Sequence, residues 1–417
     1  MKAVVGVHIG ERAIPVGEIH FTRERGKQHA SFVYFDSWLN HPGRFAIEPS
    51  LRLGPGHQYP PAGSIFFDSI TDSEPDGWGR MVIQRDRALR KAPAADSDLD
   101  FLLDVHDPSR IGALRYTIDG GRTFASDPGR GRRASPPLIE LKDLMRASAA
   151  IERRTESARD LRLLLDRGSP PGGMRPKCTV LDEHGNLSIG KFASATDERD
   201  VVRGELLALR IARDAGIDAA HADLVVAVGK PVAVVRRFDR IGNKRLMYIS
   251  AKTLIGAASP EDHHYLELAD ALRAEGGRPQ ADIEELWRRI VFSVLITNLD
   301  DHLNNHGFLH APAGGHWELA PAFDMNPAPG KARVLKTWIT EEGPEASIEL
   351  AVTALKPMGI SMERGVEILG KVVRSVTRWR EGAKALGMKK RDIDSYEQAF
   401  EHAELPAAKA LLARKAS

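Results

Sequence analysis

The chain has 417 residues, with 59 lysines and arginines against 57 aspartates and glutamates, and a formal net charge of +2. This length predicts two or more subdomains. The near balance of charge excludes a whole-protein attraction to nucleic acid or to an anionic membrane, so any basic surface has to be local.

The compartment follows from cysteine usage and from the apolar runs. The single cysteine, Cys178, excludes an internal disulfide and is typical of a reducing compartment. The apolar stretch after Met1 already contains His8 and Glu11, so it is too short and too polar for a signal peptide or a membrane anchor. No apolar run approaches the roughly 20 residues that a bilayer span needs. We therefore expect a cytoplasmic protein without a membrane partner.

Short β-type runs separated by glycine and proline fill the chain to about residue 70. They are Ala3–His8, Gly17–Phe21 and Ser31–Tyr34. They predict a small antiparallel sheet. Residues 76–80 read as a turn, and Met81–Leu89 continues as a charged helix. The Gly/Arg-rich stretch 120–135 predicts a surface connection; it could touch phosphate, but a solvated loop is the simpler interpretation.

A Gly/Pro-rich loop, residues 168–177, contains Gly172 and Gly173 and ends at Lys177. Backbone N–H groups in such a loop could contact phosphate oxygens. The alternative is a plain turn, for which Gly and Pro are equally typical.

A hairpin is predicted next, with strands Cys178–Leu181 and Leu187–Ala193 around a turn at 182–186. Period-two alternation puts Lys191 on an otherwise apolar strand face, where a lysine favours an anionic partner. The helix predicted at Glu198–Ala215 offers Glu205. A Lys191–Glu205 pair would resemble the pair that holds the nucleotide-binding lysine of protein kinases. The alternative is that both side chains reach solvent.

Two more strands are predicted within residues 222–238, and the later pattern is mainly helical, including Ile283–Asn298 and Met362–Leu386. A β-rich part with the phosphate loop, joined to a helical part with the acidic cluster described next, is the plan of a bilobal kinase.

Polar groups crowd the segment after the apolar helix predicted at Ile283–Asn298. Asp300 is followed five residues later by Asn305, and strands at His306–Ala311 and His316–Ala320 predict a hairpin with Asp324 just past its exit. Because a hairpin brings its ends together, Asn305 and Asp324 should be neighbours. This set offers a carboxylate that could accept a proton, and an amide and a carboxylate that could hold Mg²⁺, as phosphoryl transfer requires.

Two other interpretations of the cluster stay open. Asp and Asn are favoured at helix ends and in turns for purely local reasons. His302 and His306 have the i, i+4 spacing of zinc ligands on a helix, but Asn304 and Gly307 favour a loop. We therefore expect both histidines to position other groups or simply to pack.

Taken in order, these motifs resemble the HipA-type serine/threonine kinases, the toxin halves of bacterial toxin–antitoxin pairs. The matching motifs are Phe66–Ser69, Pro75–Arg80, Gly172–Lys177, Arg237–Arg240, Asn298–His302 and Leu319–Pro327. The resemblance implies an α+β, bilobal protein-kinase-like fold with a β-rich N-terminal part and a mainly helical C-terminal lobe. We expect a β-rich subdomain at 1–120, a nucleotide-binding portion at 121–240 and a helical lobe at 241–417.

The resemblance also implies roles for single residues. Asp300 would be the catalytic base, and Asn305 and Asp324 would be the Mg²⁺ ligands. The residues that would bind ATP are Gly172, Gly173, Lys177, Lys191, Glu205, Arg236, Phe238 and Asp239. Lys191 would contact phosphate, Arg236 and Phe238 would lie at the adenine hinge, and Asp239 would lie close to the ribose. Ser169 is the candidate for inactivating autophosphorylation.

Family members phosphorylate a serine or threonine of a translation protein, often an aminoacyl-tRNA synthetase, and are restrained by a small helix-turn-helix antitoxin. The resemblance thus implies an ATP- and Mg²⁺-dependent kinase whose partners are a HipB-like antitoxin and a protein substrate. DNA would be reached only through the antitoxin.

One departure from the family pattern favours a second function. Asn304 stands where the family usually has Lys or Arg, which removes a positive charge near the transferring phosphoryl group. A second hypothesis is therefore a degenerate kinase that serves as an antitoxin-binding corepressor. A third is a metal-dependent hydrolase that uses Asp300, His302, His306 and Asp324.

Overall fold

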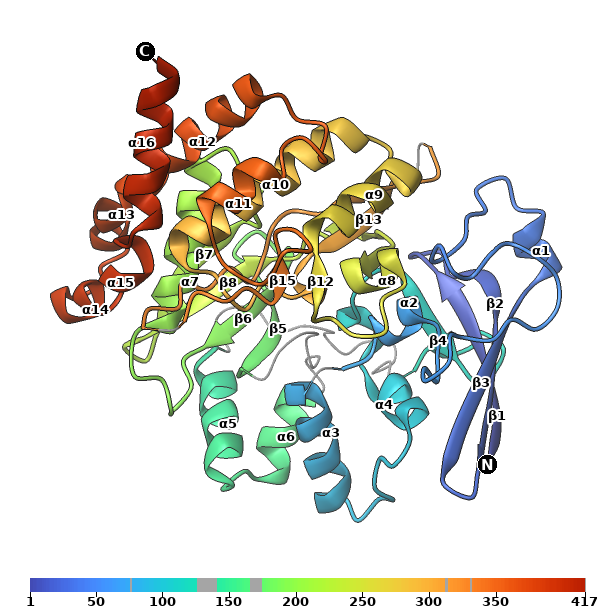
Figure 1. The fold of residues 1–417 in the computed structure, drawn as a ribbon. Coiled ribbons are helices and arrows are strands. Elements are labelled where there is room, and N and C mark those ends of the chain that lie inside the picture. Colours follow the sequence, from blue (N-terminus) through green and yellow to red (C-terminus); the bar gives the residue numbers. More distant parts are fainter. Residues whose placement is uncertain (76, 126–140, 166–174, 312–313, 331, 417) are drawn as a thin grey trace. The chain divides into compact units, whose positions relative to one another are not determined.

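The computed structural model describes residues 1–75, 77–125, 141–165, 175–311, 314–330 and 332–416. The chain folds into two units, each made of two separated stretches (Figure 1). Unit 1 comprises Met1–Thr196 and Val225–Ile249, and unit 2 comprises Asp197–Leu224 and Ser250–Ser417. The finer division expected near residues 120 and 240 stays a prediction.

Unit 1 opens with an antiparallel sheet in the order β3-β2-β1-β4. Its strands are β1 (Lys2–Ile9), β2 (Ile14–Glu24), β3 (Lys27–Tyr34) and β4 (Leu114–Thr117). The small antiparallel sheet expected from the sequence is confirmed, with longer strands. Short helices α1 (Asp36–Leu39), α2 (Asp68–Thr71) and α4 (Asp98–Asp104) lie between β3 and β4 in sequence.

Helix α3 (Gly77–Leu89) corrects one expectation. The turn predicted at residues 76–80 is wrong from Gly77 onwards, because these residues form the first turn of the helix. Trp78 and Val82, four residues apart and therefore on one helix face, are both buried in an apolar cluster. Burial of that face outweighs the low helix propensity of Gly77 and Gly79.

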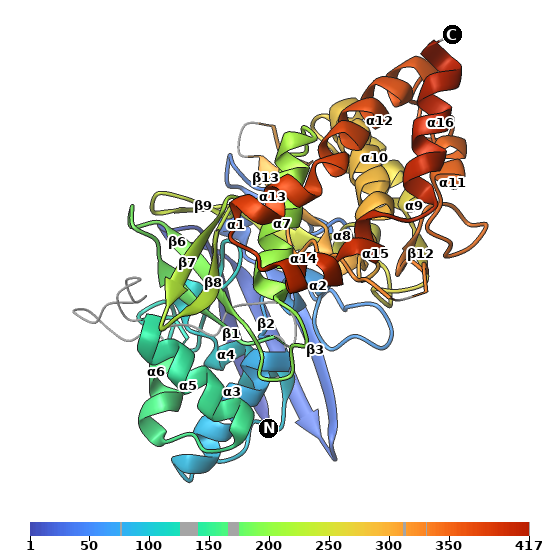
Figure 2. The ribbon, with the colours of Figure 1, turned by 90° about the vertical axis from the view of Figure 1, so that its left-hand side faces the viewer.

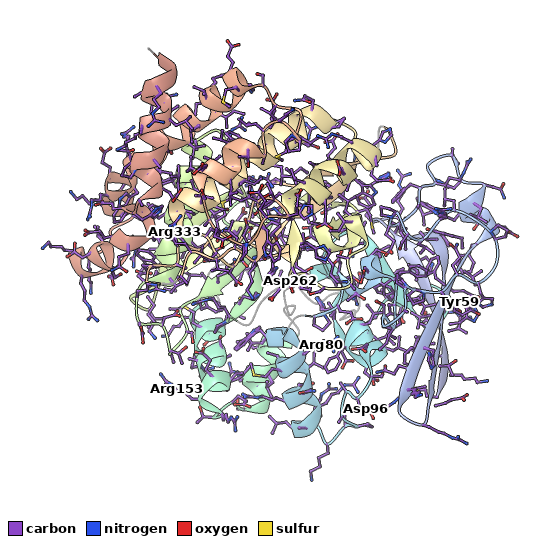
Figure 3. All side chains as sticks on the ribbon, in the orientation of Figure 1. Tyr59, Arg80, Asp96, Arg153, Asp262 and Arg333 are labelled. Carbon is purple, nitrogen blue, oxygen red and sulfur yellow. The ribbon has the colours of Figure 1, made fainter. Side chains whose placement is uncertain are left out.

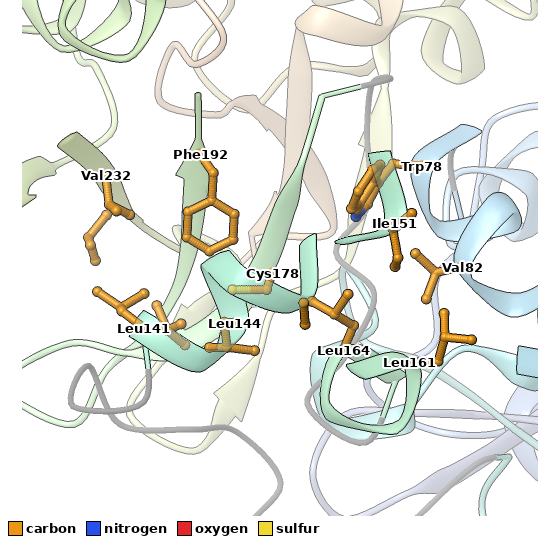
Figure 4. Packing of buried hydrophobic residues seen from close by; sticks show 13 residues of the cluster. Trp78, Val82, Leu141, Leu144, Ile151, Leu161, Leu164, Cys178, Phe192 and Val232 are labelled. Atoms are coloured by element: carbon orange, nitrogen blue, oxygen red, sulfur yellow. The ribbon is translucent and has the colours of Figure 1, made fainter. Parts of the chain in front are cut away.

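A second sheet has the order β5-β6-β8-β7 and belongs to unit 1 except for the first three residues of β7. Its strands are β5 (Lys177–Leu181), β6 (Leu187–Phe192), β7 (Ala222–Ala227) and β8 (Lys230–Arg236). Helices α5 (Leu141–Arg153) and α6 (Ala158–Leu165) lie beside each other in both ribbon views (Figures 1 and 2). Their leucines pack with Cys178, Val180, Phe192, Val232 and Val234 (Figure 4). The two helices therefore cover one face of this sheet.

Unit 2 is mainly helical. Its helices are α7 (Val201–Asp214), α8 (Ala251–Ile255), α9 (Tyr265–Glu275), α10 (Pro279–Ile296), α11 (Ile348–Thr353), α12 (Met362–Thr377), α13 (Trp379–Ala385), α14 (Lys390–Ser395), α15 (Glu397–Phe400) and α16 (Glu404–Ala416). Helix α7 starts three residues later than expected because the Asp200 side chain accepts from the Arg203 N–H and caps it. Helix α10 starts four residues earlier than expected, with Pro279 in its first turn.

The short strands complete the fold. They are β9 (Arg240–Ile241), β10 (Lys244–Arg245), β11 (Tyr248–Ser250), β12 (His263–His264), β13 (Gly307–Ala311), β14 (His316–Leu319) and β15 (Thr337–Trp338). The predicted hairpin is confirmed in β13 and β14, which pair from Phe308 opposite Leu319 to Ala311 opposite His316. None of the helices in the described part of the chain combines the length and the apolarity of a membrane span.

Candidate functional site

The candidate catalytic segment begins where α10 ends. Residues 290–296 are all buried, and Thr297 adopts a left-handed conformation (φ 56°) that stops the helix. Arg333, labelled in Figure 3, donates to the Val294 carbonyl at 2.7 Å and to the Thr297 hydroxyl at 2.8 Å. A cation at a helix C-terminus stabilises the unpaired carbonyls there. The next residues therefore leave the helix at a fixed point.

Asp300 and Asn305 are joined directly. The carboxylate-bearing residue Asp300 is exposed, and Asn305 closes a short 3₁₀ helix, Leu303–Asn305. The Asn305 amide donates through Nδ2 to the Asp300 backbone carbonyl at 2.7 Å. This contact aims the other amide atom, Oδ1, away from that carbonyl, and an amide oxygen is a suitable ligand for Mg²⁺.

A buried polar cluster lies behind Asp300. Asp301 is 5% exposed and accepts hydrogen bonds from Ser293 Oγ at 3.0 Å, from His306 Nε2 at 3.1 Å and from the Tyr265 hydroxyl. Burial raises the pKa of Asp301, but the His306 charge and these three hydrogen bonds outweigh burial and hold it below its usual value. The cluster thus keeps an ionised carboxylate in the interior, and His306 is one of the groups that position it.

Asp324 connects to the same cluster through a chain of hydrogen bonds. Asn326 donates through Nδ2 to Asp324 Oδ1 at 3.2 Å and through its backbone N–H to Asn298 Oδ1 at 3.0 Å. Asn298 in turn donates to Ser293 Oγ at 3.3 Å, and Ser293 donates to Asp301. The segment that carries Asp300 and the segment that carries Asp324 therefore share one polar framework.

The backbone of Asp324 is itself unusual. Its φ of 55° lies in the left-handed region, which few residues other than glycine adopt, although aspartate tolerates it better than most. Such conformations cluster at functional sites, where surrounding structure holds them. This geometry is an independent reason to examine Asp324 as a functional residue.

Lys336 places a positive charge near Asp300. Lys336 Nζ contacts Glu261 Oε1 at 2.7 Å. That hydrogen bond raises the pKa of Lys336, and the fields of Asp300 and Asp262 raise it further. The family usually has Lys or Arg at the position of Asn304. Lys336 supplies a positive charge near Asp300 where that one is missing.

The donor set bears on which metal fits. Within the described ranges, no group of three or more His, Cys, Asp or Glu side chains could hold a metal ion. Asn305 and Asp324 offer one amide oxygen and one carboxylate, which are the kinds of oxygen ligand that Mg²⁺ prefers, and their role as its ligands stays a prediction. Because His306 is committed to Asp301, the proposed Asp300–His302–His306–Asp324 hydrolase site gains no support.

In unit 1 the two candidate lysines lie directly opposite each other. Lys177 of β5 pairs in register with Lys191 of β6, which pairs in turn with Ala233 of β8. Residues that lie opposite each other on neighbouring strands point to the same face of the sheet. Cys178, the next residue after Lys177, points to the other face, which α5 and α6 cover. Lys177 is 5% exposed. This sheet face thus carries two lysines opposite each other, and their role in binding phosphate stays a prediction.

The predicted hinge residues differ in environment. Arg236 ends β8 with an exposed side chain, 3.4 Å from Asp182 Oδ2. Phe238 is partly buried, with its ring 6.2 Å from that of Tyr248. Nothing in either environment conflicts with a role beside a nucleotide, and that role stays a prediction.

Asp239 is committed to the interior of unit 1. Its carboxylate accepts from the Gly112 N–H at 2.7 Å, Arg237 Nε at 2.6 Å and Arg240 Nη1 at 2.7 Å. Burial raises its pKa, but the two guanidinium groups lower it far below the usual range. Arg237 also donates to the Ser109 carbonyl at 2.7 Å. These contacts give Asp239 a structural use, so its predicted proximity to a ribose gains no support.

The described part of the structure does not bring the remaining predicted site residues together. Ser169, Gly172 and Gly173 lie outside the described residues. Glu205 is buried in α7 of unit 2, whereas Lys191 belongs to unit 1. Their pairing therefore stays a prediction.

The β-rich unit 1 and the mainly helical unit 2 form an α+β, bilobal protein-kinase-like fold. Residues 169–380, just over half of the chain, match the family described as HipA-like C-terminal domain, and the chain belongs to this family. The resemblance drawn from its motifs is confirmed.

Three relatives illustrate the range of similarity. HipA of Shewanella oneidensis MR-1, solved with HipB and operator DNA, superposes with a TM-score of 0.65 at 15% identity, covering 98% of this chain and 96% of its own. A candidate kinase of Sinorhizobium fredii, Y4mE, is 23% identical over 329 residues, 73% of either chain. A candidate kinase of Haemophilus influenzae is 26% identical over 185 residues, 38% of this chain and 52% of that relative. The chain thus spans about half the length of the Haemophilus protein.

Proposed function

We propose that this protein is an ATP- and Mg²⁺-dependent serine/threonine protein kinase that acts as the toxin of a HipA-type toxin–antitoxin pair. The observation that carries the proposal is the hydrogen-bonded framework of unit 2, in which Asn305 binds the Asp300 carbonyl and Asn326, Asn298 and Ser293 link Asp324 to Asp301. Phosphoryl transfer depends mainly on positioning and charge stabilisation, which such a framework supplies.

Each residue then has a chemical task. Asp300, exposed and next to a buried anchor, accepts the proton of the attacking serine or threonine hydroxyl. Asn305 Oδ1 and the Asp324 carboxylate would hold Mg²⁺, which when bound screens the phosphate charges. Lys191 and Lys177 bind phosphate oxygens from the sheet of unit 1. Lys336 offers positive charge near the reacting groups despite Asn304.

The partners are proposed by analogy. Because the Shewanella HipA is solved with HipB and operator DNA, we propose a HipB-like helix-turn-helix antitoxin as partner, with DNA reached through it. We propose a translation-related substrate such as an aminoacyl-tRNA synthetase, a cytoplasmic location, and regulation at Ser169.

Incubation of the purified chain with γ-labelled ATP and a cell lysate tests this function. We expect Mg²⁺-dependent phosphate on a serine or threonine of one or a few lysate proteins, read by mass spectrometry, and its loss when EDTA is added. Label that appears equally without a divalent cation would contradict the Mg²⁺ site.

One observation favours a second function. Asn304 is exposed on the 3₁₀ helix and supplies no charge to a transferring phosphoryl group. A degenerate kinase that serves as an antitoxin-binding corepressor would leave both the lysate and the chain itself unlabelled, yet would still bind its antitoxin. Restoring the cation with Asn304→Lys distinguishes the two functions, because a functional kinase should gain rate, whereas a corepressor should not acquire one.

A further inference from the structure

Unit 2 contains a basic groove that shares no residue with the Asp300 segment. It has a volume of about 960 Å³ and lies among α7, α12, α13 and α16. Both ribbon views show α12 and α16 side by side (Figures 1 and 2). Ser375 Oγ donates to the Ile211 carbonyl at 2.7 Å, and a Cβ on Gly382 would lie 2.9 Å from Leu207 Cδ1. Close helix contacts therefore fix the walls of the groove.

The groove carries more positive than negative charge. Its lining cations are Arg210, Lys371, Arg374, Arg378 and Lys409, and its lining carboxylates are Asp214 and Glu381. Arg378 pairs with Glu381 at 2.8 Å, and Lys371 pairs with Glu367 at 3.2 Å. The other three cations have no carboxylate within 4.0 Å among the residues that the structure describes. Unpaired cations around a concave surface focus a positive potential that attracts anions.

The lining also indicates which kind of anion fits. Ile211 and Val373 contribute apolar atoms at the base, and Asp214 lies among the cations. A phosphodiester backbone gains nothing from apolar atoms and is repelled by a carboxylate. A peptide segment can use all three kinds of lining group, because its acidic side chains pair with the cations, its aliphatic side chains cover the apolar atoms, and its backbone N–H groups can donate to Asp214.

We propose that this basic groove binds an acidic, aliphatic-containing peptide segment of another protein. The charge imbalance draws the acidic side chains to Arg210, Arg374 and Lys409, while the aliphatic ones cover Ile211 and Val373. The chain is nearly neutral as a whole, so its basic surface is local. This groove is such a surface, and it acts as a docking site. The proposal does not depend on phosphate transfer, because no groove residue belongs to the candidate catalytic segment.

Fluorescence anisotropy of the full chain tests this assignment. The probe is a labelled peptide of alternating Glu and Leu or Ala, about 12 residues long, which at about 3.3 Å per residue is long enough to cross the groove. Peptides with Lys for Glu, and a short duplex DNA, are the comparisons. We expect salt-sensitive binding of the acidic peptide alone, weakened at least about tenfold by the double substitution Arg374→Glu/Lys409→Glu.

A charge-matched control separates the groove from general electrostatics. Lys384→Glu/Lys390→Glu changes the net charge equally at exposed positions outside the lining, and should leave affinity within about twofold. If the reversed double variant melts early, Arg374→Gln/Lys409→Gln replaces it. The proposal is overturned if no acidic peptide binds at about 100 µM, if both doubles weaken binding equally, or if the DNA binds more tightly through Arg374 and Lys409.

Discussion

In unit 2 the position of Asp300 depends on side chains, whereas in unit 1 the position of Lys191 depends on backbone pairing. Asp301 holds its segment through Ser293, His306 and Tyr265, which come from other elements. Lys191 instead faces Lys177 because the hairpin register puts them opposite each other. A network of side-chain hydrogen bonds is disrupted when one member is removed, whereas backbone hydrogen bonds between strands persist when a side chain is exchanged. The candidate residues of unit 2 and those of unit 1 should therefore respond differently to mutation.

The largest effect is expected for Asp300→Asn. Because this residue is exposed, the free energy of unfolding should stay within about 0.5 kcal/mol. The rate of phosphate transfer should fall by about 10²- to 10⁴-fold, since the proton acceptor is lost. Transfer from labelled ATP and denaturant unfolding measure the two quantities. Asp270→Asn, an exposed carboxylate on α9, is the control, and full activity of Asp300→Asn would remove the proposed base.

Asp301→Ala should affect both stability and rate. It leaves the Tyr265 hydroxyl, the Ser293 hydroxyl and His306 without their shared acceptor in the interior, so the free energy of unfolding should fall by about 3 kcal/mol or more. Phosphate transfer should fall with it, because Asp300 loses its anchor. Asp301→Asn keeps the shape and part of the hydrogen bonding, so its loss should be smaller. Unchanged thermal melting of Asp301→Ala would show that backbone geometry alone holds the segment.

The same contrast explains what the sequence could predict. Elements that depend on local pattern, such as the β13–β14 hairpin and the end of α10, were predicted closely. The opposition of Lys177 and Lys191 was missed, although counting outwards from the turn at 182–186 would have found it. Here the signal was present in the sequence.

Two other outcomes depend in part on contacts between residues far apart in the sequence. Asp300 and Asp301 are identical neighbours, yet the second is buried, and one of its three hydrogen-bond donors, Tyr265, lies 36 residues earlier. Asp239 was expected beside a ribose, but it is bound by Gly112, 127 residues earlier. Burial decided by such long-range contacts cannot be deduced from spacing along the chain.

For the lysine pair we expect binding to change and stability to persist. Lys191→Met should weaken ATP binding by about tenfold or more, since a charged hydrogen bond to phosphate is lost. The free energy of unfolding should change by no more than about 1 kcal/mol, because the backbone pairing of β5, β6 and β8 does not depend on this side chain. Isothermal titration with ATP and denaturant unfolding measure both. Lys177→Met is the matched variant, and unchanged ATP affinity in both variants would show that phosphate does not lie on this sheet face.

The smallest effect expected is on the pH dependence of stability. One buried carboxylate in each unit contributes to it, and the two contributions have opposite signs. Burial raises the pKa of Glu74 in unit 1 to about 8 despite the opposing charge of Arg80, whereas the pKa of Asp301 in unit 2 is lowered. The raised pKa of Glu74 lies above its unfolded value, so its contribution is present in acid and is lost as pH rises towards 8. The lowered pKa of Asp301 lies below its unfolded value, so its contribution is present above pH of about 4 and is lost in stronger acid.

Hydrogen exchange read separately for the two units checks these signs. Between pH 5 and pH 8, protection in unit 1 should fall after correction for the intrinsic rate, by about 1 kcal/mol or more of opening free energy, since one pKa unit corresponds to about 1.4 kcal/mol. Glu74→Gln, which cannot ionise, should remove this dependence, while Asp301→Asn should leave it in place. If Glu74→Gln keeps the full pH dependence of unit 1, another group titrates there and the buried carboxylate is ionised throughout.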